Sequence, residues 1–367
     1  MIDSDLMEKK YIGALIGGAI GDALGYYVEF ESEDYIFSKY GRDGITEFPQ
    51  GKKGLISDDT QMTLFTACGV LNSYAMGLKS LEDISNCIYL SYLDWLSTQR
   101  YSFSSYKLSN NIANTFLVNY QDLFASRAPG MTCMRSLFSG VKGTTERPLN
   151  SSKGCGGVMR VAPIGLFYKE TIDDVAMLGA MACAITHGHP LGFIPGAAYS
   201  HIINLLTHSD ISIEEAVLDS NKMIKKLFGN YEETKYYLDL IDKAIKLSKT
   251  DTIPLDAIHM LGEGWVAEET LSISIYSALI AKDDFKKGVV ISSNHNGDSD
   301  STGSLTGAIL GAKLGFDAIP LEYINNLELK DLIIDVGRDL YKTQIYDSLV
   351  NDTDFIEKYV LKTKGKI

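Results

Sequence analysis

Apolar residues recur every three or four positions along most of this chain, which is the spacing of one face of an α-helix. The alternation with a period of two that marks half-buried strands is scarce. The pattern therefore predicts an all-α fold built from long helices. We expect helices over residues 11–30, 58–78, 81–96, 112–124, 171–186, 192–207, 213–227, 235–249, 267–281, 301–314 and 329–340.

The helical pattern continues without a clear linker, so we expect a single domain that spans residues 1–367. Residues 97–152 are polar and less regular, and we expect them to form a cap or lid on that domain. The charged segment 345–367 is expected to be a peripheral tail. The 8 prolines leave long helices uninterrupted, whereas the 33 glycines require a separate explanation.

Two of the predicted helices carry a glycine at every fourth position. The glycines are Gly13, Gly17, Gly21 and Gly25 in the first helix, and Gly303, Gly307, Gly311 and Gly315 in the second. A spacing of four places such residues on nearly one face of a helix. Each interior glycine destabilises a helix by about 0.5–1 kcal/mol relative to alanine, and a close approach of two backbones would offset that loss. We therefore predict that the two helices pack directly against each other.

The overall charge and the cysteines indicate which ligands and which cellular compartment to expect for this protein. A net charge of −13 repels nucleic-acid backbones, so general nucleic-acid binding is not expected. The 5 cysteines are scattered without a C-x-x-C pair, which is typical of a reducing compartment. The first residues lack the features of a signal peptide, and the apolar run Ile12–Gly21 is too short to span a bilayer. We expect a cytoplasmic protein that makes no contact with membranes.

Two short acidic clusters each open a predicted helix: Ser-Asp-Asp-Thr at residues 57–60 and Asp-Ser-Asp-Ser at residues 298–301. Helix capping explains part of this composition, because Ser and Asp at a helix start satisfy free N–H groups and complement the helix dipole. If the clusters converge, their four carboxylates repel one another unless a cation lies between them. Such oxygen ligands select Mg²⁺, Mn²⁺ or Ca²⁺ over zinc, and bridging carboxylates can hold two ions.

The second cluster does not match an EF-hand loop, although its acidic residues invite the comparison. Asn296, Asp298 and Asp300 would occupy loop positions one, three and five. Ser301 then stands where the loop requires glycine, and Gly307 stands where it requires glutamate.

Two further segments contain residues suited to binding a ligand. In residues 154–157, three glycines surround Cys155; such a loop lets a backbone approach a ligand and lets its N–H groups bind phosphate. Cys155 has no identifiable partner that would make it a nucleophile. His187 and His189 have a spacing that zinc can use, but a helix that ends at a polar histidine before Pro190 is the commoner arrangement. We expect His187 to contact a substrate.

The first glycine-bearing helix contributes two acidic residues to this picture. Asp22 lies within its stripe of small residues, where structural pairing is the simplest role. Glu29 lies near the predicted end of the same helix and could reach a site formed by other segments.

Taken in order, these segments resemble the ADP-ribosylglycohydrolase family, which includes dinitrogenase reductase-activating glycohydrolases. The motifs are G-D-A-L-G…E-F, S-D-D-T, G-x-G-G-x-M-R, T-H-x-H-P and G-D-S-D-S, and they lie between residues 11 and 316. No single motif is specific, whereas the ordered set is. The resemblance implies an orthogonal all-α helical bundle with two Mg²⁺ or Mn²⁺ ions in a central metal-binding cleft.

The resemblance also implies roles for individual residues. Many family members have asparagine at the position of Cys155 and threonine at those of Ser57 and Ser301, so the ribose pocket is expected to differ in shape while the hydroxyl ligands remain. The implied metal ligands are Ser57, Asp58, Asp59, Asp298, Asp300 and Ser301. The implied catalytic residues are Glu29, Asp59 and Asp300, and the implied substrate-binding residues are Ser152, Gly154, Cys155, Gly156, Gly157 and His187.

The activity implied by the resemblance is hydrolysis of the C1″ glycosidic bond of an ADP-ribosylated protein or small molecule, through an oxocarbenium-like transition state. One alternative is a non-catalytic ADP-ribose-binding or crystallin-like protein with the same fold. Another is a metal-dependent phosphohydrolase, but such helical enzymes usually carry adjacent His-Asp pairs, and this chain has none.

Overall fold

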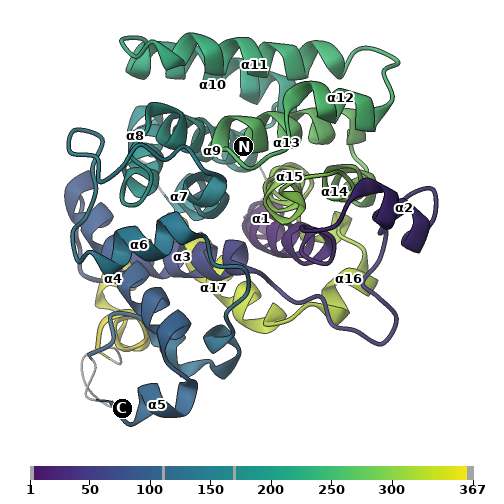
Figure 1. Ribbon diagram of the computed structural model, residues 1–367. Helices are drawn as coiled ribbons and strands as arrows, with labels where there is room; N and C mark the ends of the chain where they lie inside the picture. Colours follow the sequence, from purple (N-terminus) through teal and green to yellow (C-terminus); the bar gives the residue numbers. More distant parts are fainter. Residues whose placement is uncertain (1–3, 110–111, 168–170, 362–367) are drawn as a thin grey trace.

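The computed structural model describes residues 4–109, 112–167 and 171–361, and the regular elements of this part of the chain are helices joined by loops (Figure 1). Its β-type pairings are two isolated bridges, between Gly54 and Leu327 and between Gly154 and Val266. The predicted all-α class is therefore confirmed. The longer helices are α1 (Ser4–Gly25), α3 (Asp58–Ala75), α4 (Leu81–Arg100), α8 (Ile172–Ala184), α9 (Pro190–His208), α10 (Ile213–Phe228), α11 (Glu233–Leu247), α13 (Ala267–Ala281), α15 (Ser299–Leu314) and α17 (Lys330–Ile345).

Shorter elements connect these helices. The short α-helices are α2 (Glu33–Tyr40), α5 (Phe103–Lys107), α6 (Met131–Phe138), α7 (Ala162–Phe167), α12 (Pro254–Leu261), α14 (Phe285–Ser293), α16 (Leu321–Asn326) and α18 (Thr353–Ile356). The 3₁₀ turns are η1 (Phe116–Asn119), η2 (Gln121–Phe124), η3 (Cys155–Arg160), η4 (Phe316–Ala318) and η5 (Asp347–Asn351), and η6 (Glu357–Leu361) is a π turn.

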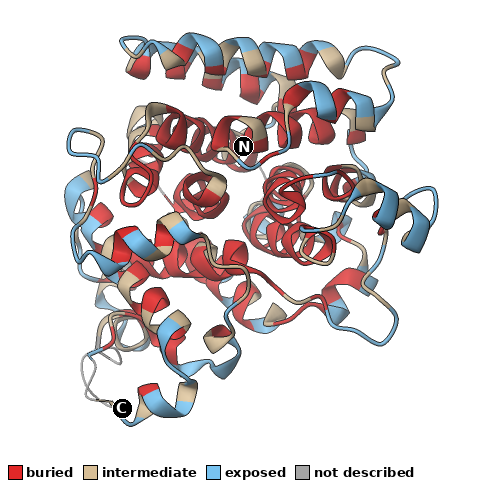
Figure 2. Ribbon diagram, viewed as in Figure 1, coloured by how far each residue is buried: buried red, intermediate tan, exposed pale blue. Residues whose placement is uncertain are grey.

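Helices α1 and α15 lie side by side at the centre of the bundle (Figure 1). Helices α9 and α13 separate them from the outer pair α10 and α11, and α17 and α3 lie on the opposite side. Figure 2 shows that the central helices are buried on nearly every side, whereas α10 and α11 expose their outward faces. An amphipathic pattern therefore marks the outer layer, and small residues mark the centre.

The predicted contact between the two glycine-bearing helices is confirmed. We call the facing glycines of the two helices the glycine ridge: Gly13, Gly17, Gly21, Gly303, Gly307 and Gly311. A Cβ atom added at Gly17 would lie 2.3 Å from the carbonyl oxygen of Gly307, and one added at Gly307 would lie 2.0 Å from that of Gly17. The helices run antiparallel, because the facing pairs are Gly13 with Gly311, Gly17 with Gly307 and Gly21 with Gly303. At these separations only glycine fits on either side.

The two outer glycines of the sequence pattern behave differently. Gly25 faces Ser299, so the ridge brings the end of α1 against the first residue of α15. Gly315 also lies against α1, because a Cβ atom added at Gly13 would come within 2.8 Å of its carbonyl carbon, but its backbone is left-handed with φ of 83° and terminates α15. The ridge therefore fixes the end of one helix against the start of the other.

Two predicted helices differ from the structure. The one expected over residues 11–30 stops at Gly25, and a turn with Val28 N–H donating to Gly25 C=O follows. Residues 112–124 form two 3₁₀ turns in place of one helix. The Asp94 carboxylate accepts hydrogen bonds from the backbone N–H groups of Asn114 and Thr115, both at 2.7 Å, and this holds the segment out of helical conformation.

The polar segment 97–152 contains the end of α4, α5, both 3₁₀ turns and α6, and its role as a cap or lid stays a prediction. Of the tail predicted over residues 345–367, the described part runs to Leu361 and places the rings of Phe355 and Tyr359 in the core. Residues 362–367 of that tail lie outside the described residues, as do 110–111 of the polar segment.

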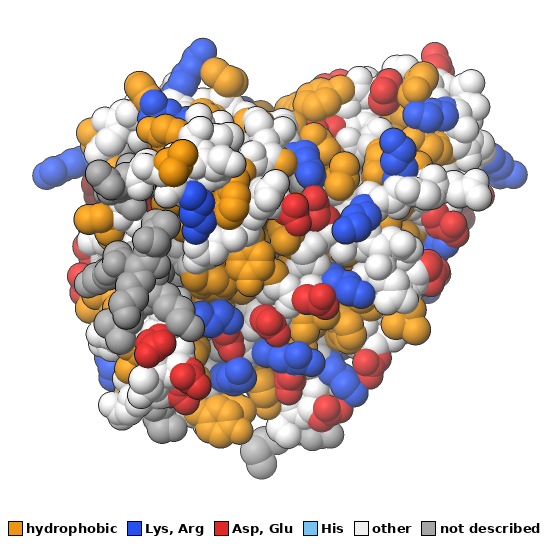
Figure 3. Space-filling model, turned by 90° about the horizontal axis from the view of Figure 1, so that it is seen from below, with side chains coloured by type: hydrophobic (Ala, Val, Ile, Leu, Met, Phe, Trp, Pro, Cys, Tyr) orange, Lys and Arg blue, Asp and Glu red, His pale blue; other side chains and the backbone are white. Residues whose placement is uncertain are grey.

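Charged side chains of both signs are interspersed on the face shown in Figure 3. The buried Asp339 accepts hydrogen bonds from the ammonium groups of Lys342 and Lys358. Among the described residues, every helix is either too short or too polar to traverse a lipid bilayer.

Candidate functional site

The two acidic clusters come together at the first turns of α3 and α15. The Ser57 side chain caps α3 by accepting from Asp59 N–H at 3.2 Å, and the Asp298 side chain caps α15 by accepting from Ser301 N–H at 3.4 Å. The Ser301 hydroxyl then donates to Asp59 Oδ1 at 3.3 Å, across 242 residues of sequence. Capping thus explains how each cluster is built locally, and the glycine ridge helps to bring α15 to this place.

Asp22 on α1 organises the first turn of α3. Its carboxylate accepts from the backbone N–H groups of Ser57 and Thr60 at 3.1 Å and from the Thr60 hydroxyl. Burial, with a contribution from the neighbouring Asp300, raises the pKa of Asp22 to about 7. The pairing role expected for Asp22 from the sequence is therefore what the contacts show, and its partners are residues of the candidate site.

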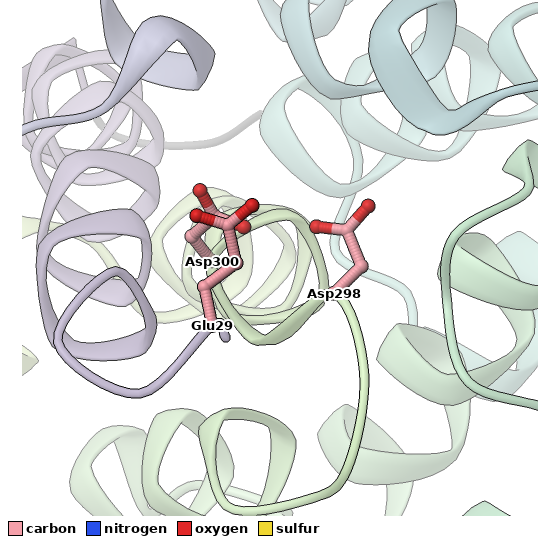
Figure 4. A group of neighbouring side chains, drawn as sticks. All are labelled: Glu29, Asp298 and Asp300. Atoms are coloured by element: carbon pink, nitrogen blue, oxygen red, sulfur yellow. The ribbon is translucent and has the colours of Figure 1, made fainter. Parts of the chain in front are cut away.

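Glu29, Asp298 and Asp300 form a group of three buried carboxylates (Figure 4). Each offers one oxygen, and these oxygens lie within 4.8 Å of one another, which suffices for a shared metal ion. Glu29 comes from the turn after α1, and the two aspartates come from the start of α15. Burial, followed by the charges of Asp300 and Asp298, raises the pKa of Glu29 to about 10.

Asp58 and Asp59 enlarge this acidic group. Burial and the charge of Asp300 raise the pKa of both side chains well above the ordinary range. Asp58 Oδ2 accepts from Gly130 N–H at 3.1 Å. Within the described residues, Asp59 Oδ2 and Glu29 Oε2 are buried without a hydrogen-bond partner. Buried carboxylate oxygens that are crowded and unpaired fit a divalent cation, which would relieve both the repulsion and the missing contacts.

A salt bridge with no counterpart among the sequence motifs braces the start of α3. Arg127 donates two hydrogen bonds to Glu328, at 2.9 and 3.0 Å, and a third to the carbonyl oxygen of Ile56 at 2.9 Å. Glu328 also accepts from Ile56 N–H at 3.2 Å. The two charged residues are separated by 201 positions, and neither lies in a recognisable motif.

The glycine-rich segment, in η3 and the residues before it, lies next to the acidic group. The Ser152 hydroxyl accepts from Gly154 N–H at 3.3 Å, and Cys155 N–H donates to the carbonyl oxygen of Trp265 at 3.2 Å. The Trp265 ring stacks on Phe30, with ring centroids 6.2 Å apart, so this segment meets the turn that carries Glu29. The Trp265 contacts had no counterpart among the sequence motifs.

Cys155 lies close enough to the acidic group for the negative charges there to affect the pKa of its thiol. Burial raises the pKa of its thiol, and Asp298 and Asp59 raise it further. A thiol in such surroundings stays protonated, which argues against a nucleophilic cysteine. The influence of Asp298 and Asp59 indicates that the glycine-rich segment lies next to the acidic clusters.

The two histidines of the T-H-x-H-P motif separate into different roles. His189 is the N-cap of α9, where its side chain accepts from Leu191 N–H, and Pro190 begins that helix instead of ending the preceding one. His187 is buried beside the glycine-rich segment, with Nε2 3.5 Å from the position of a Cβ atom added at Gly154. Burial and the nearby Arg160 lower the pKa of His187 to about 3, so its ring is neutral.

Comparison with known proteins gives consistent results over most of the chain. A family model described as ADP-ribosylglycohydrolase matches residues 3–348. An uncharacterised protein of Archaeoglobus fulgidus is 26% identical over 342 residues, which cover 92% of this chain and 97% of that protein. The ADP-ribosyl-[dinitrogen reductase] glycohydrolase of Rhodospirillum rubrum is 24% identical over 332 residues, covering 88% of this chain and 92% of the relative.

A solved structure described as an ADP-ribosylglycohydrolase-related protein complex has a similar fold. It superposes with a TM-score of 0.56 at 20% identity, covering 93% of this chain and 100% of the solved chain. At this identity the likeness concerns the fold alone.

Proposed function

This chain belongs to the ADP-ribosylglycohydrolase family, and from that premise we propose that it hydrolyses the C1″ glycosidic bond of ADP-ribosylated proteins or small molecules, releasing ADP-ribose. The observation that carries this proposal is the meeting of two acidic helix starts, from residues 57–60 and 298–301, with Glu29 in one buried site. Helix capping alone gives no reason for the two clusters to share a site.

The donor set fits two divalent cations, Mg²⁺ or Mn²⁺, because it consists of carboxylates and hydroxyls. When bound, these ions would supply positive charge to the ribose diol and would lower the pKa of a water molecule. The residues that would hold them are Ser57, Asp58, Asp59, Asp298, Asp300 and Ser301.

The remaining site residues would orient the substrate and move protons. Glu29 lies with the two aspartates of α15 and would act as the general base for the attacking water once bound cations lower its raised pKa. The backbone N–H groups of Gly156 and Gly157 would bind the pyrophosphate, because those of Gly154 and Cys155 already donate to Ser152 and Trp265. The His187 ring would lie beside them. Asp22 and the Arg127–Glu328 pair would hold the first turn of α3 in register with α15.

A panel of ADP-ribosylated acceptors tests the proposed function directly. Acceptors linked through arginine, serine and a nucleobase would each be incubated with the chain and Mg²⁺ or Mn²⁺, and free ADP-ribose would be measured. We expect release from at least one class, which would also identify the acceptor. Tight ADP-ribose binding without release from any acceptor would favour the non-catalytic alternative, and release of phosphate would favour the phosphohydrolase.

Divalent cations are expected to stabilise the folded chain. A ligand that binds only the folded state stabilises it by about 2.7 kcal/mol at a concentration one hundred times its Kd. Mg²⁺ or Mn²⁺ should therefore raise the Tm in a thermal unfolding experiment, and a chelator should reverse the increase. A Tm that saturating metal leaves unchanged would contradict the proposed metal site.

A further inference from the structure

Arg160, the last residue of η3, is a fully buried cation beside the proposed substrate site. Within the described residues no carboxylate pairs with it, although burying an unpaired charge is costly. Its Nη2 atom donates to the carbonyl oxygen of Ala182 at 3.1 Å and to Thr186 Oγ1 at 2.7 Å. Its other contacts are Met62 Sδ, Cys133 Sγ and the ring of Tyr92. The strongest bond to a side chain is thus the one to Thr186.

The bond from Arg160 occupies one lone pair of the Thr186 hydroxyl and leaves its proton to be donated elsewhere. A guanidinium group only donates, so Thr186 Oγ1 is the acceptor in this pair. The same oxygen lies 2.8 Å from His187 Nδ1. Its single proton is available to that nitrogen, which is a far stronger acceptor than the nearby Cys133 sulfur. When Nδ1 accepts, the proton of the neutral imidazole must be on Nε2.

The Nε2 atom of His187 faces the glycine-rich segment. It lies 3.5 Å and 3.3 Å from the positions that Cβ atoms added at Gly154 and Gly156 would take. A Cβ atom at Gly156 would also come within 3.0 Å of His187 Cε1, so glycine at this position makes room for the ring. In the described part of the chain no protein atom accepts a hydrogen bond from Nε2. The donor is therefore directed at the space where the proposed ligand lies.

We propose that Arg160 and Thr186 are positioning residues that fix the His187 proton on Nε2, so that His187 donates a hydrogen bond to a phosphate or hydroxyl oxygen of the ADP-ribosyl group. The proposal rests on the proposed function, because it takes the ADP-ribosyl group as the ligand. It adds the buried arginine of the G-x-G-G-x-M-R motif to the binding machinery as a residue that acts through two others.

The tautomer of His187 can be measured in the unmodified chain without substrate. In a nitrogen-15 spectrum of the histidine rings, protonated and unprotonated nitrogens resonate at well-separated positions, and a His187→Gln variant identifies the signals of His187. At neutral pH we expect a proton on Nε2 and none on Nδ1. A proton on Nδ1, or on both nitrogens, would overturn the proposal.

Two variants of Thr186 test whether the bond chain matters for binding. Thr186→Ser retains the hydroxyl, whereas Thr186→Val removes it and keeps the branched shape. We expect Thr186→Val to weaken ADP-ribose binding in calorimetry by about 10-fold and Thr186→Ser by no more than about 2-fold, as the loss of one hydrogen bond predicts. Equal affinities in two folded variants would contradict the proposal, and if Thr186→Val does not fold, the tautomer of the unmodified chain decides.

These measurements separate the positioning role from the proposed activity. If the proton is on Nε2 and ADP-ribose binds but no acceptor is cleaved, the hydrolase proposal fails and the positioning of His187 stands. If the chain releases ADP-ribose while His187 carries its proton on Nδ1, the hydrolase proposal stands and the positioning role is wrong.

Discussion

Alanine at Gly17 is expected to destabilise the fold, whereas alanine at the adjacent Gly18 is expected to leave its stability unchanged or slightly higher. A Cβ atom at Gly17 would lie 2.3 Å from the carbonyl oxygen of Gly307, so the two helices would have to separate. At Gly18 the nearest atoms are 3.4 Å away, which is ordinary van der Waals contact. Overpacking of this kind costs about 1–3 kcal/mol, and larger side chains such as leucine cost more.

The pair is well matched, because both residues are buried in α1 and receive the same methyl group. Alanine in place of a helical glycine gains about 0.5–1 kcal/mol where there is space for it, which sets the expected sign at Gly18. Chemical denaturation of both variants would measure the difference in the free energy of unfolding. Equal stabilities would mean that the close approach of α1 and α15 contributes nothing to the fold.

The glycine ridge shows which parts of the fold are accessible from sequence. Four-residue spacing has a direct meaning on a helix, so the faces of α1 and α15 and their contact could be predicted. Gly315 obeys the same spacing, but its left-handed backbone terminates α15. A pattern along one helix cannot distinguish the last packed residue from the residue that ends the helix.

Predictions fail where a side-chain hydrogen bond that the apolar spacing does not show determines the local conformation. Residues 112–124 have helical spacing, but Asp94 takes the backbone N–H groups of Asn114 and Thr115. Pro190 was expected to end a helix, and it begins α9 because His189 provides the cap. The first outcome depends on a side chain twenty positions away, and the second depends on a cap by the neighbouring histidine.

The candidate site was predictable in composition but not in geometry. Both acidic clusters indicate the start of a helix, and the structure confirms this, because Ser57 caps α3 and Asp298 caps α15. The prediction that the two clusters share a site came from the resemblance to a family, because local spacing carries no information about residues more than 200 positions apart. The Arg127–Glu328 pair, which braces α3, belongs to no motif and required the structure.

Asparagine at Asp59 or at Asp300 is expected to reduce turnover by at least about 100-fold, the loss commonly seen when the support of a metal site fails. Asparagine preserves the size of the side chain and removes its charge. The two residues are joined in the structure through the start of α15, where Ser301, adjacent to Asp300, donates to Asp59. If both serve one metal site, losing either ligand displaces the same ion or ions.

Three measurements separate this explanation from a simple loss of folding. Asp210→Asn, at an aspartate that is 94% exposed, should retain full activity, because its ion pair with Lys313 lies on the surface. The metal-dependent increase in Tm should disappear in Asp59→Asn and in Asp300→Asn. Both variants should still fold without metal, because each loses a carboxylate whose pKa is raised by burial and by neighbouring acidic residues. The double variant should be little worse than the worse single variant, because residues that act as a unit are not additive. Independent losses that multiply would instead mean that the two aspartates act separately in the first turns of their helices. Full activity in either single variant would refute the mechanism.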